Sequence, residues 1–156
     1  MSEPKFKKSF AVYRARKSND GVAAQFDFNP QSKLLFLEMA AQTNKQDTKG
    51  NALFDWKSKI AFKLGTVDIG EILCVLIGKQ AGVGRFDDGR HKGLYHENEK
   101  GNAVLYFEKG KHGGYYIKLS IRRGEDKIQL SQTLTNGEGI ILPTLLRCVV
   151  EAKYDW

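Results

Sequence analysis

The chain reads FDWKSKIAFKL over residues 54–64 and continues directly as GTVDIG over residues 65–70. In the first part, large apolar residues alternate with lysines, and a period of two is typical of a strand with one face in a core. We therefore predict one continuous strand over Phe54–Leu64. Its large apolar residues are expected to point inward and its lysines outward; the inward set is Phe54, Trp56, Ile60 and Phe62, and the outward set is Lys57, Lys59 and Lys63.

The sequence period changes after this strand. Residues 66–77 are apolar except for a narrow polar edge, which predicts a helix that is capped by Thr66 and buried on most sides. A second helix is predicted to start at Thr135, because Thr135 and Glu138 have the spacing of a capping box. Pro143 should kink this second helix, since proline cannot donate a backbone hydrogen bond. Its wide apolar arc predicts a second packing surface, such as a subunit contact.

Alternating segments flank both predicted helices. We predict four strands in the first half, at residues 6–17, 22–29, 33–42 and 54–64, and four in the second half, at residues 94–98, 103–109, 115–123 and 127–134. Residues 80–92, between the first helix and the second set of strands, are predicted to be a loop. The result is an α+β fold with two antiparallel four-stranded sheets, each followed by a helix. We assign residues 1–8 to a flexible basic N-terminus and residues 9–156 to a single domain.

Length and composition limit the possible functions. At 156 residues the chain can form one domain with a real core. Lys and Arg number 25 against 18 Asp and Glu, which gives a formal charge of +7. This balance favours a polyanionic partner, with nucleic acid first and an acidic membrane surface second. Aromatic residues make up 11% of the chain, enough for both a core and a stacking surface.

Neither terminal signals nor cysteines indicate secretion. The N-terminus has no apolar signal segment, and no apolar run reaches the length of a membrane span. Cys74 and Cys148 lie in apolar runs without CxxC spacing, which predicts reduced, buried thiols. We expect a protein of the cytoplasm, associated with a nucleoid or made in a phage-infected host, and not a secreted one.

Four stretches carry a resemblance through their order and spacing. Residues 20–25 (DGVAAQ) lie at the start of the second strand, residues 54–64 contain an aromatic-Asp-Trp sequence, residues 114–120 read GYYIKLS, and residues 135–156 end in a second aromatic-Asp-Trp. In this arrangement the chain resembles the Whirly family of single-stranded DNA-binding proteins, whose fold is related to that of the transcription coactivator PC4. Residues 20–25 correspond to the family motif KGKAAL. The resemblance covers about residues 9–156.

The resemblance implies a Whirly-type fold, sequence-independent binding of single-stranded DNA, no catalytic activity and no cofactor. It also implies a homo-oligomer, with a tetramer favoured. The two lysines of the family motif fall on Asp20 and Val22 here. The second of them is tied in plant members to higher assembly of tetramers, so larger assemblies are not implied for this chain. The transit peptide of plant members is absent too, which points to a bacterial or phage relative.

A single-strand binder needs cations for phosphates and flat apolar faces for unstacked bases. In the strand at 115–123, alternation places Tyr116, Lys118 and Arg122 on one polar face. The first strand adds a tyrosine and two arginines, and residues 54–64 add three lysines. The predicted nucleic-acid-binding residues are Tyr13, Arg14, Arg16, Lys57, Lys59, Lys63, Tyr116, Lys118 and Arg122, with Tyr13 and Tyr116 as the stacking candidates. Taken singly, each lysine also fits a merely solvated face, and each tyrosine fits cross-strand packing.

Other motifs give weaker signals. The glycines at 78–84 follow a helix, not a strand, and lack the spacing of a phosphate-binding loop. His91, His96 and His112 have no partners at metal-ligand spacing, so no zinc site is predicted. No arrangement of nucleophile, base and acid stands out, and the chain is therefore predicted not to be an enzyme.

We predict a single-stranded DNA-binding protein that coats or protects exposed strands in replication, recombination or repair. Two alternatives stay open at this point. The same surface could bind or anneal RNA, or the chain could be a PC4-like transcription regulator that acts through protein contacts. The C-terminal Tyr154-Asp155-Trp156 is either a partner-docking tail or the last turn of the helix.

Overall fold

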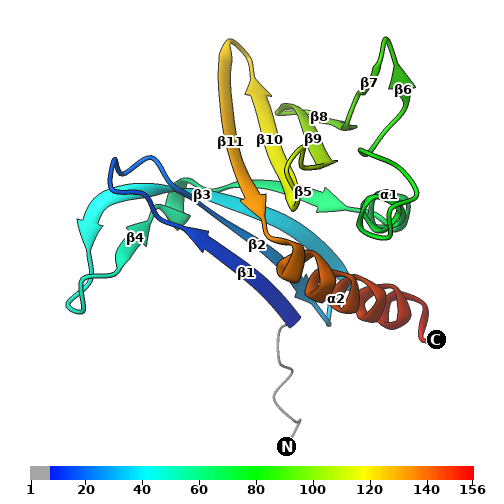
Figure 1. Cartoon of the computed structure of the whole chain (residues 1–156), viewed down its shortest axis with the longest axis horizontal. Helices are drawn as coiled ribbons and strands as arrows, with labels where there is room; N and C mark the ends of the chain where they lie inside the picture. Colours follow the sequence, from blue (N-terminus) through cyan, green and yellow to red (C-terminus); the bar gives the residue numbers. More distant parts are fainter. Residues whose placement is uncertain (1–7) are drawn as a thin grey trace, which may run out of the picture.

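A computed structural model describes residues 8–156, and Figure 1 shows how its elements are arranged. Two antiparallel sheets and two α-helices form the fold, and a small hairpin stands beside the second sheet. The predicted α+β fold with two antiparallel sheets, each followed by a helix, is confirmed. The predicted N-terminal segment 1–8 lies outside the described residues except for Lys8, which is the first residue of a strand.

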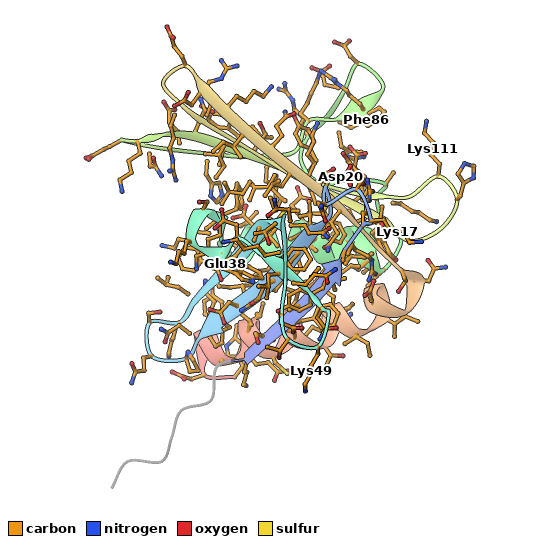
Figure 2. The ribbon with its side chains drawn as sticks, turned by 90° about the vertical axis from the view of Figure 1, so that its left-hand side faces the viewer. Lys17, Asp20, Glu38, Lys49, Phe86 and Lys111 are labelled. Atoms are coloured by element: carbon orange, nitrogen blue, oxygen red, sulfur yellow. The ribbon has the colours of Figure 1, made fainter. Side chains whose placement is uncertain are left out.

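The first sheet contains five strands, one more than predicted. They are β1 (Lys8–Arg14), β2 (Val22–Asn29), β3 (Leu34–Gln46), β4 (Ala52–Phe54) and β5 (Ile60–Leu64). The strand order is β1-β2-β3-β4, and β5 also pairs with β3. The far end of β3 and the short β4 form an arm that projects from the sheet, with Lys49 at its tip (Figures 1 and 2).

The extra strand arises because the prediction of one continuous strand over Phe54–Leu64 is wrong. The chain breaks at Asp55, whose carboxylate accepts a hydrogen bond from Ser58 N at 3.3 Å. A single 3₁₀ turn, η1 (Trp56–Ser58), follows. Such local side-chain bonds compete with the ladder bonds of a sheet, and one turn of helix also resets the alternation of side chains. Only the β5 part of the stretch keeps the predicted parity.

The second sheet contains β8 (Leu94–Asn98), β9 (Gly101–Lys109), β10 (Tyr115–Arg123) and β11 (Asp126–Leu134). Its strand order is β11-β10-β9-β8, so each strand pairs with its neighbour in sequence. This part of the fold agrees with the prediction to within two residues at every strand end. The segment predicted as a loop differs, because it holds a two-stranded hairpin, β6 (Phe86–Asp87) and β7 (Arg90–His91).

The two helices, α1 (Thr66–Leu76) and α2 (Asn136–Tyr154), pack against each other at one end of the molecule (Figure 1). The hydroxyls of Thr66 and Tyr154 are 2.8 Å apart, which joins the start of α1 to the end of α2. The cap of α1 is Gly65 and not Thr66 as predicted, and Asp68 Oδ2 accepts a hydrogen bond from Gly65 N. The predicted Thr135–Glu138 capping box of α2 is confirmed.

One hydrophobic core lies between the inner faces of the two sheets and the helices. Its largest fully buried side chains include Phe26, Phe28, Phe62 and Phe107 from the sheets, together with Ile69 and Ile72 from α1. Side chains alternate across a strand, so every second residue of each sheet faces away from this core. We call these two solvent-facing surfaces the outer faces of the first and second sheets.

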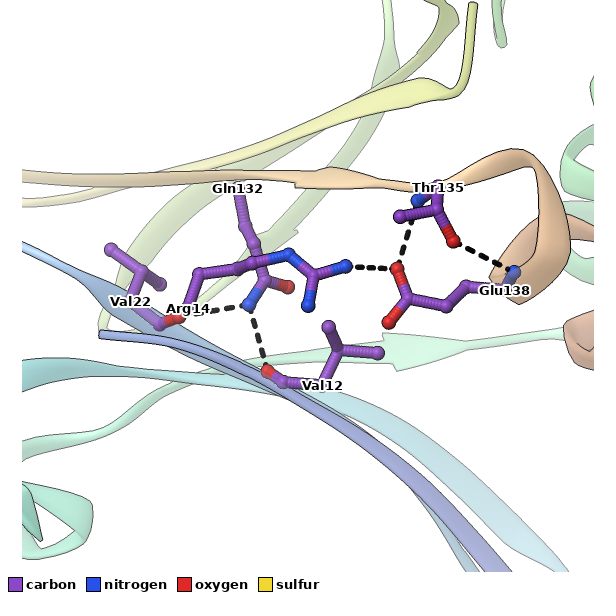
Figure 3. A network of polar contacts seen from close by, with 6 residues as sticks. All are labelled: Val12, Arg14, Val22, Gln132, Thr135 and Glu138. Carbon is purple, nitrogen blue, oxygen red and sulfur yellow. Dashed lines mark hydrogen bonds and ion pairs between the residues drawn. The ribbon is translucent and has the colours of Figure 1, made fainter. Parts of the chain in front are cut away.

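A buried glutamine ties the two sheets together where β11 crosses β1 and β2 (Figure 3). Gln132, on the inner face of β11, donates from Nε2 to Val12 O at 2.7 Å and to Val22 O at 2.8 Å. Within residues 8–156 the buried Oε1 of Gln132 has no hydrogen-bond partner, so the two bonds from Nε2 make up the polar contact of this amide. The amide of Gln132 therefore fixes the position of the second sheet over the first.

Two further observations complete the fold. Within residues 8–156, no helix combines the length and the apolar character needed to cross a bilayer. Cys74 and Cys148 are free, as predicted, but both are half-buried and not buried. Their partial exposure follows from their helix positions, since the neighbouring Ile72 and Val149 take the places that face the core.

Candidate nucleic-acid interface

The outer face of the second sheet gathers tyrosines and cations. On β10, the inner residues Ile117, Leu119 and Ile121 are buried, which leaves the other parity to solvent. The predicted residues Tyr116, Lys118 and Arg122 therefore share the outer face with Ser120. Alternation within a single strand was enough to predict this part of the site.

Neighbouring strands add residues that the prediction did not include. Tyr106 on β9 lies directly opposite Lys118, and the Lys118 ammonium group is 4.7 Å from the centre of the Tyr106 ring. Tyr95 on β8 has 56% of its surface exposed, and Lys127 on β11 lies opposite Arg122. These residues could have been predicted, because Tyr106 alternates with the core residues around it in the same way as Tyr116.

The middle of this outer face is slightly concave. A hollow of about 180 Å³ opens between β9, β10 and β11, and its wall includes Tyr106, Arg122 and Lys127. A flat ring beside two cations provides both features that a single strand requires, a stacking platform and charge for the phosphates. We call Tyr95, Tyr106, Tyr116, Lys118, Arg122 and Lys127 the tyrosine–cation face.

An aromatic cluster lies on the outer face of the first sheet. Tyr13 is opposite Ala23 on the outer side of β1, and 55% of its surface is exposed. Its ring is 5.5 Å from that of Phe54 and 6.4 Å from that of Trp56. The prediction that Phe54 and Trp56 point into the core is therefore wrong, because the break at Asp55 turns both rings to the outer side.

The three predicted lysines of residues 54–64 reach the surface in different settings. Lys57 lies in η1 and Lys63 on the outer side of β5, and both are exposed. Lys59 forms an ion pair with Glu38 of β3, whose side chain is largely covered. Lys57 and Lys63 thus have charges available for a ligand, whereas the charge of Lys59 is already balanced.

Arg14 stands apart from the other predicted residues. It follows Tyr13 in β1, so its side chain lies on the opposite, inner side of the first sheet. There its guanidinium pairs with Glu138 in the first turn of α2 (Figure 3). Because Glu138 also caps the helix through its bond from Thr135 N, the ion pair joins β1 to the start of α2.

Arg16 lies in the turn between β1 and β2, the region that Lys17 and Asp20 mark in Figure 2. Gln42 of β3 holds this turn, since its side chain accepts hydrogen bonds from Arg16 N and Gly21 N and donates one to Arg16 O. The hydroxyl of Ser18 and the nearby Arg16 guanidinium hold the pKa of Asp20 below its ordinary value. The Asp20 carboxylate lies 3.8 Å from the Arg16 guanidinium and offsets part of its charge.

A polar hollow connects this turn to the second sheet. It measures about 330 Å³ and lies between the β1–β2 turn and β11. Its wall includes Arg16 and Asp20 on one side and Gln129, Ser131 and Thr133 on the other. The last three residues belong to the outer side of β11, next to the tyrosine–cation face. The hollow thus leads from that face to the turn that precedes β2.

The described residues hold two separate groups of predicted site residues. Tyr116, Lys118 and Arg122 lie on the second sheet, while Tyr13 and Lys63 lie on the first sheet and Lys57 lies in η1, between β4 and β5. Arg16 lies in the wall of the polar hollow, on the side of the group on the first sheet. Among residues 8–156, no three His, Cys, Asp or Glu side chains are placed to hold a metal ion.

Comparisons with known proteins establish the fold. The sequence matches no protein-family model, and it matches no curated protein. Among solved structures, WHY1 from Arabidopsis thaliana superposes with a TM-score of 0.70 at 16% identity, over 97% of this chain and 87% of that one. The plant transcriptional regulator PBF-2 gives 0.69 at 17% identity, over 99% and 86%.

A structure of a guide-RNA-binding protein complex bound to a guide RNA gives a TM-score of 0.69 at 14% identity, over 96% of this chain and 94% of that one. The chain therefore has the fold of the Whirly proteins, as predicted. At these identities the likeness concerns the fold, and the predicted bacterial or phage origin stays a prediction.

Proposed function

We propose that this chain binds single-stranded nucleic acid on the outer faces of its sheets, with DNA as the principal ligand. The observation that carries the proposal is the tyrosine–cation face, where three tyrosines and three cations share one side of the second sheet. The bound protein would coat or protect exposed strands in replication, recombination or repair. The proposed role is binding without a catalytic step.

The geometry favours unpaired strands over duplexes. Tyrosine rings on a sheet face can stack only on bases that are free of a partner strand, and each stacked base contributes roughly 1–3 kcal/mol. Stacking also explains the proposed lack of sequence preference, because every base has a π-face. Lys118, Arg122 and Lys127 would contact the phosphates between the stacked bases.

RNA is the main alternative ligand. One of the structures with this fold is a protein complex bound to a guide RNA, and another is a plant transcriptional regulator. Base stacking and phosphate contacts occur with either sugar, so the tyrosine–cation face suits both polymers. The ratio of the affinities for oligo-dT and oligo-U measures the preference between DNA and RNA.

We further propose that the chain works as a homo-oligomer, with a tetramer favoured. Large apolar side chains are exposed on both helices, with Val67 at 79% on α1 and Ile140 at 73% on α2. Exposed apolar side chains are what a contact between subunits would cover. Assembly through the helices would leave the outer faces of both sheets free. Native mass spectrometry should give a multiple of the chain mass, and Ile140→Glu should reduce it.

The binding experiment compares labelled oligo-dT, oligo-U and duplex of equal length by fluorescence anisotropy over a range of salt concentrations. We expect oligo-dT to bind more tightly than duplex, and the affinity to fall with salt as several phosphate contacts require. Equal affinity for oligo-dT and duplex would refute the proposal. A flat response to salt would instead support a role through protein contacts.

A further inference from the structure

The β6–β7 hairpin is a short projection between α1 and β8. Phe86 pairs with His91 and Asp87 with Arg90, around a two-residue turn at Asp88 and Gly89. Both turn residues have positive φ, at 50° and 76°, which is the conformation that matches the twist of a tight hairpin. In Figure 1 the hairpin stands out beside β8, away from the helices.

The base of the hairpin is part of the second sheet. β8 pairs with β9 only as far as Leu94 and Leu105. The C-terminal end of β9, at Glu108, pairs instead with Gly82, which lies before the hairpin in sequence. In that segment Val83 is fully buried, and its N–H donates to Phe107 O at 3.1 Å. Lys109 N donates to Ala81 O at 2.8 Å. The hairpin therefore grows from a fixed edge.

Two glycines close the neck of the hairpin. Gly84 and Gly93 have φ values of 85° and 83°, and a Cβ added at Gly84 would lie 2.1 Å from Gly93 O. Only glycine permits this approach of the two backbones. Gly93 N donates to Val83 O at 3.1 Å, and His91 Nδ1 lies 3.1 Å from Gly84 O. These contacts hold the hairpin in one orientation relative to the sheet.

The hairpin presents an aromatic ring among cations. Phe86 has 62% of its surface exposed, and its ring and that of His91 form an edge contact at a centroid distance of 5.1 Å. Figure 2 marks Phe86 on this projection. Arg85 is held near Asp87 at 3.5 Å, whereas Arg90 and Lys92 have no acidic partner within residues 8–156.

The hairpin adjoins the tyrosine–cation face. A Cβ added at Gly93 would lie 3.2 Å from Cδ1 of Tyr106, so the neck packs against that ring. Gly82, just before the neck, pairs with Glu108, and Glu108 lies opposite Tyr116. The exposed ring of Phe86 thus stands at the border of the surface to which bases are proposed to bind.

We infer that the β6–β7 hairpin extends the nucleic-acid-binding surface beyond the sheet. Phe86 stacks on a base that lies past the tyrosine–cation face, and Arg90 and Lys92 contact the phosphates beside it. This inference rests on the proposed function. Its occupant is a single strand because an exposed ring flanked by cations matches the alternation of bases and phosphates, and because the hairpin continues a surface with the same features.

The test compares wild type with Phe86→Ala on oligo-dT of about 6 and about 16 nucleotides, within the range of known single-strand site sizes. Loss of one stacked base should weaken binding of the long oligonucleotide about 5- to 100-fold and leave the short one unchanged. Phe86→Tyr keeps a ring and should bind like wild type. Asp88→Asn, at the turn of the same hairpin, keeps a residue that tolerates the positive φ; it is the matched control and should not weaken binding.

Two further measurements locate the contact. Photo-crosslinking of oligonucleotides that contain 5-iodouracil should label Phe86, and Arg90→Gln with Lys92→Gln should lower the dependence of log K on log salt by roughly 0.7 for each lost phosphate contact. Unchanged long-strand affinity in Phe86→Ala, while wild type still binds, would overturn the hairpin inference alone. Failure of wild type to bind either length would overturn the proposed function itself.

Discussion

The ammonium group of Lys118 lies 4.7 Å from the centre of the Tyr106 ring, across the β9–β10 ladder of the second sheet. An ammonium group at this distance from a tyrosine ring is attracted by the π-electrons. The contact restrains two side chains that would otherwise be mobile on an open sheet face. Restraint before binding lowers the entropy that a ligand must remove when it binds.

The first prediction concerns the Tyr106 ring. Tyr106→Leu keeps an apolar side chain against Gly93 but removes the flat platform, so oligo-dT affinity should fall by about 5- to 100-fold. Tyr106→Phe keeps the ring and should retain most of the affinity. Fluorescence anisotropy gives both values, and circular dichroism checks the fold of each variant. Equal affinities for the leucine and phenylalanine variants would contradict a stacking role.

The second prediction separates charge from stacking. Lys118→Gln should reduce the slope of log K against log salt by roughly 0.7, the value for one phosphate contact on a single strand. The affinity should converge with that of wild type at high salt. Lys49→Gln, at the tip of the β3–β4 arm, is a control of equal charge change that lies outside the tyrosine–cation face. An equal change of slope in both variants would show that only net charge matters.

Alternation along the chain predicted the second sheet and the β10 residues of its outer face. Tyr116, Lys118 and Arg122 alternate with buried residues over an unbroken strand, so their common side follows from the period alone. The same reasoning applied to Tyr106 would have added it to the site. Local pattern was sufficient here because the strands of this sheet have no break and pair with their neighbours in sequence.

Inference from alternation fails for residues 54–64. Their sequence keeps a period of two, but the Asp55 carboxylate accepts a hydrogen bond from Ser58 N, and a 3₁₀ turn begins there. Phe54 and Trp56 consequently join Tyr13 outside the core. The position of Arg14 could not be predicted either, since its partner Glu138 is distant in sequence and meets it only in the folded chain.

The third prediction concerns the bond between the sheets. Gln132→Leu should lower the free energy of unfolding by about 1–3 kcal/mol, because the carbonyls of Val12 and Val22 lose a buried donor. Gln129→Leu, an exposed residue of the same strand, should change stability by less than about 0.5 kcal/mol. Urea unfolding followed by circular dichroism measures both. A Gln132→Leu variant as stable as wild type would mean that the amide does not hold the sheets together.

The fourth prediction concerns the break at Asp55. Asp55→Ala removes the side-chain acceptor for Ser58 N and should cost about 1 kcal/mol, the usual value for a lost helix cap. Without its cap the η1 turn should loosen, so Trp56 should move away from Tyr13. Tryptophan fluorescence reports this movement when measured in a Trp156→Phe background, which leaves Trp56 as the one tryptophan of the chain.

Asp55→Asn is the matched control for that experiment, because asparagine also accepts a hydrogen bond at a cap position. It should retain the fluorescence and stability of the parent, while the alanine variant should show a red-shifted emission and a lower melting temperature. The alanine variant should also bind oligo-dT more weakly if the aromatic cluster of the first sheet contacts bases. Unchanged emission in Asp55→Ala would show that packing against Tyr13 and Phe54, and not the Asp55 cap, holds Trp56 on the outer face.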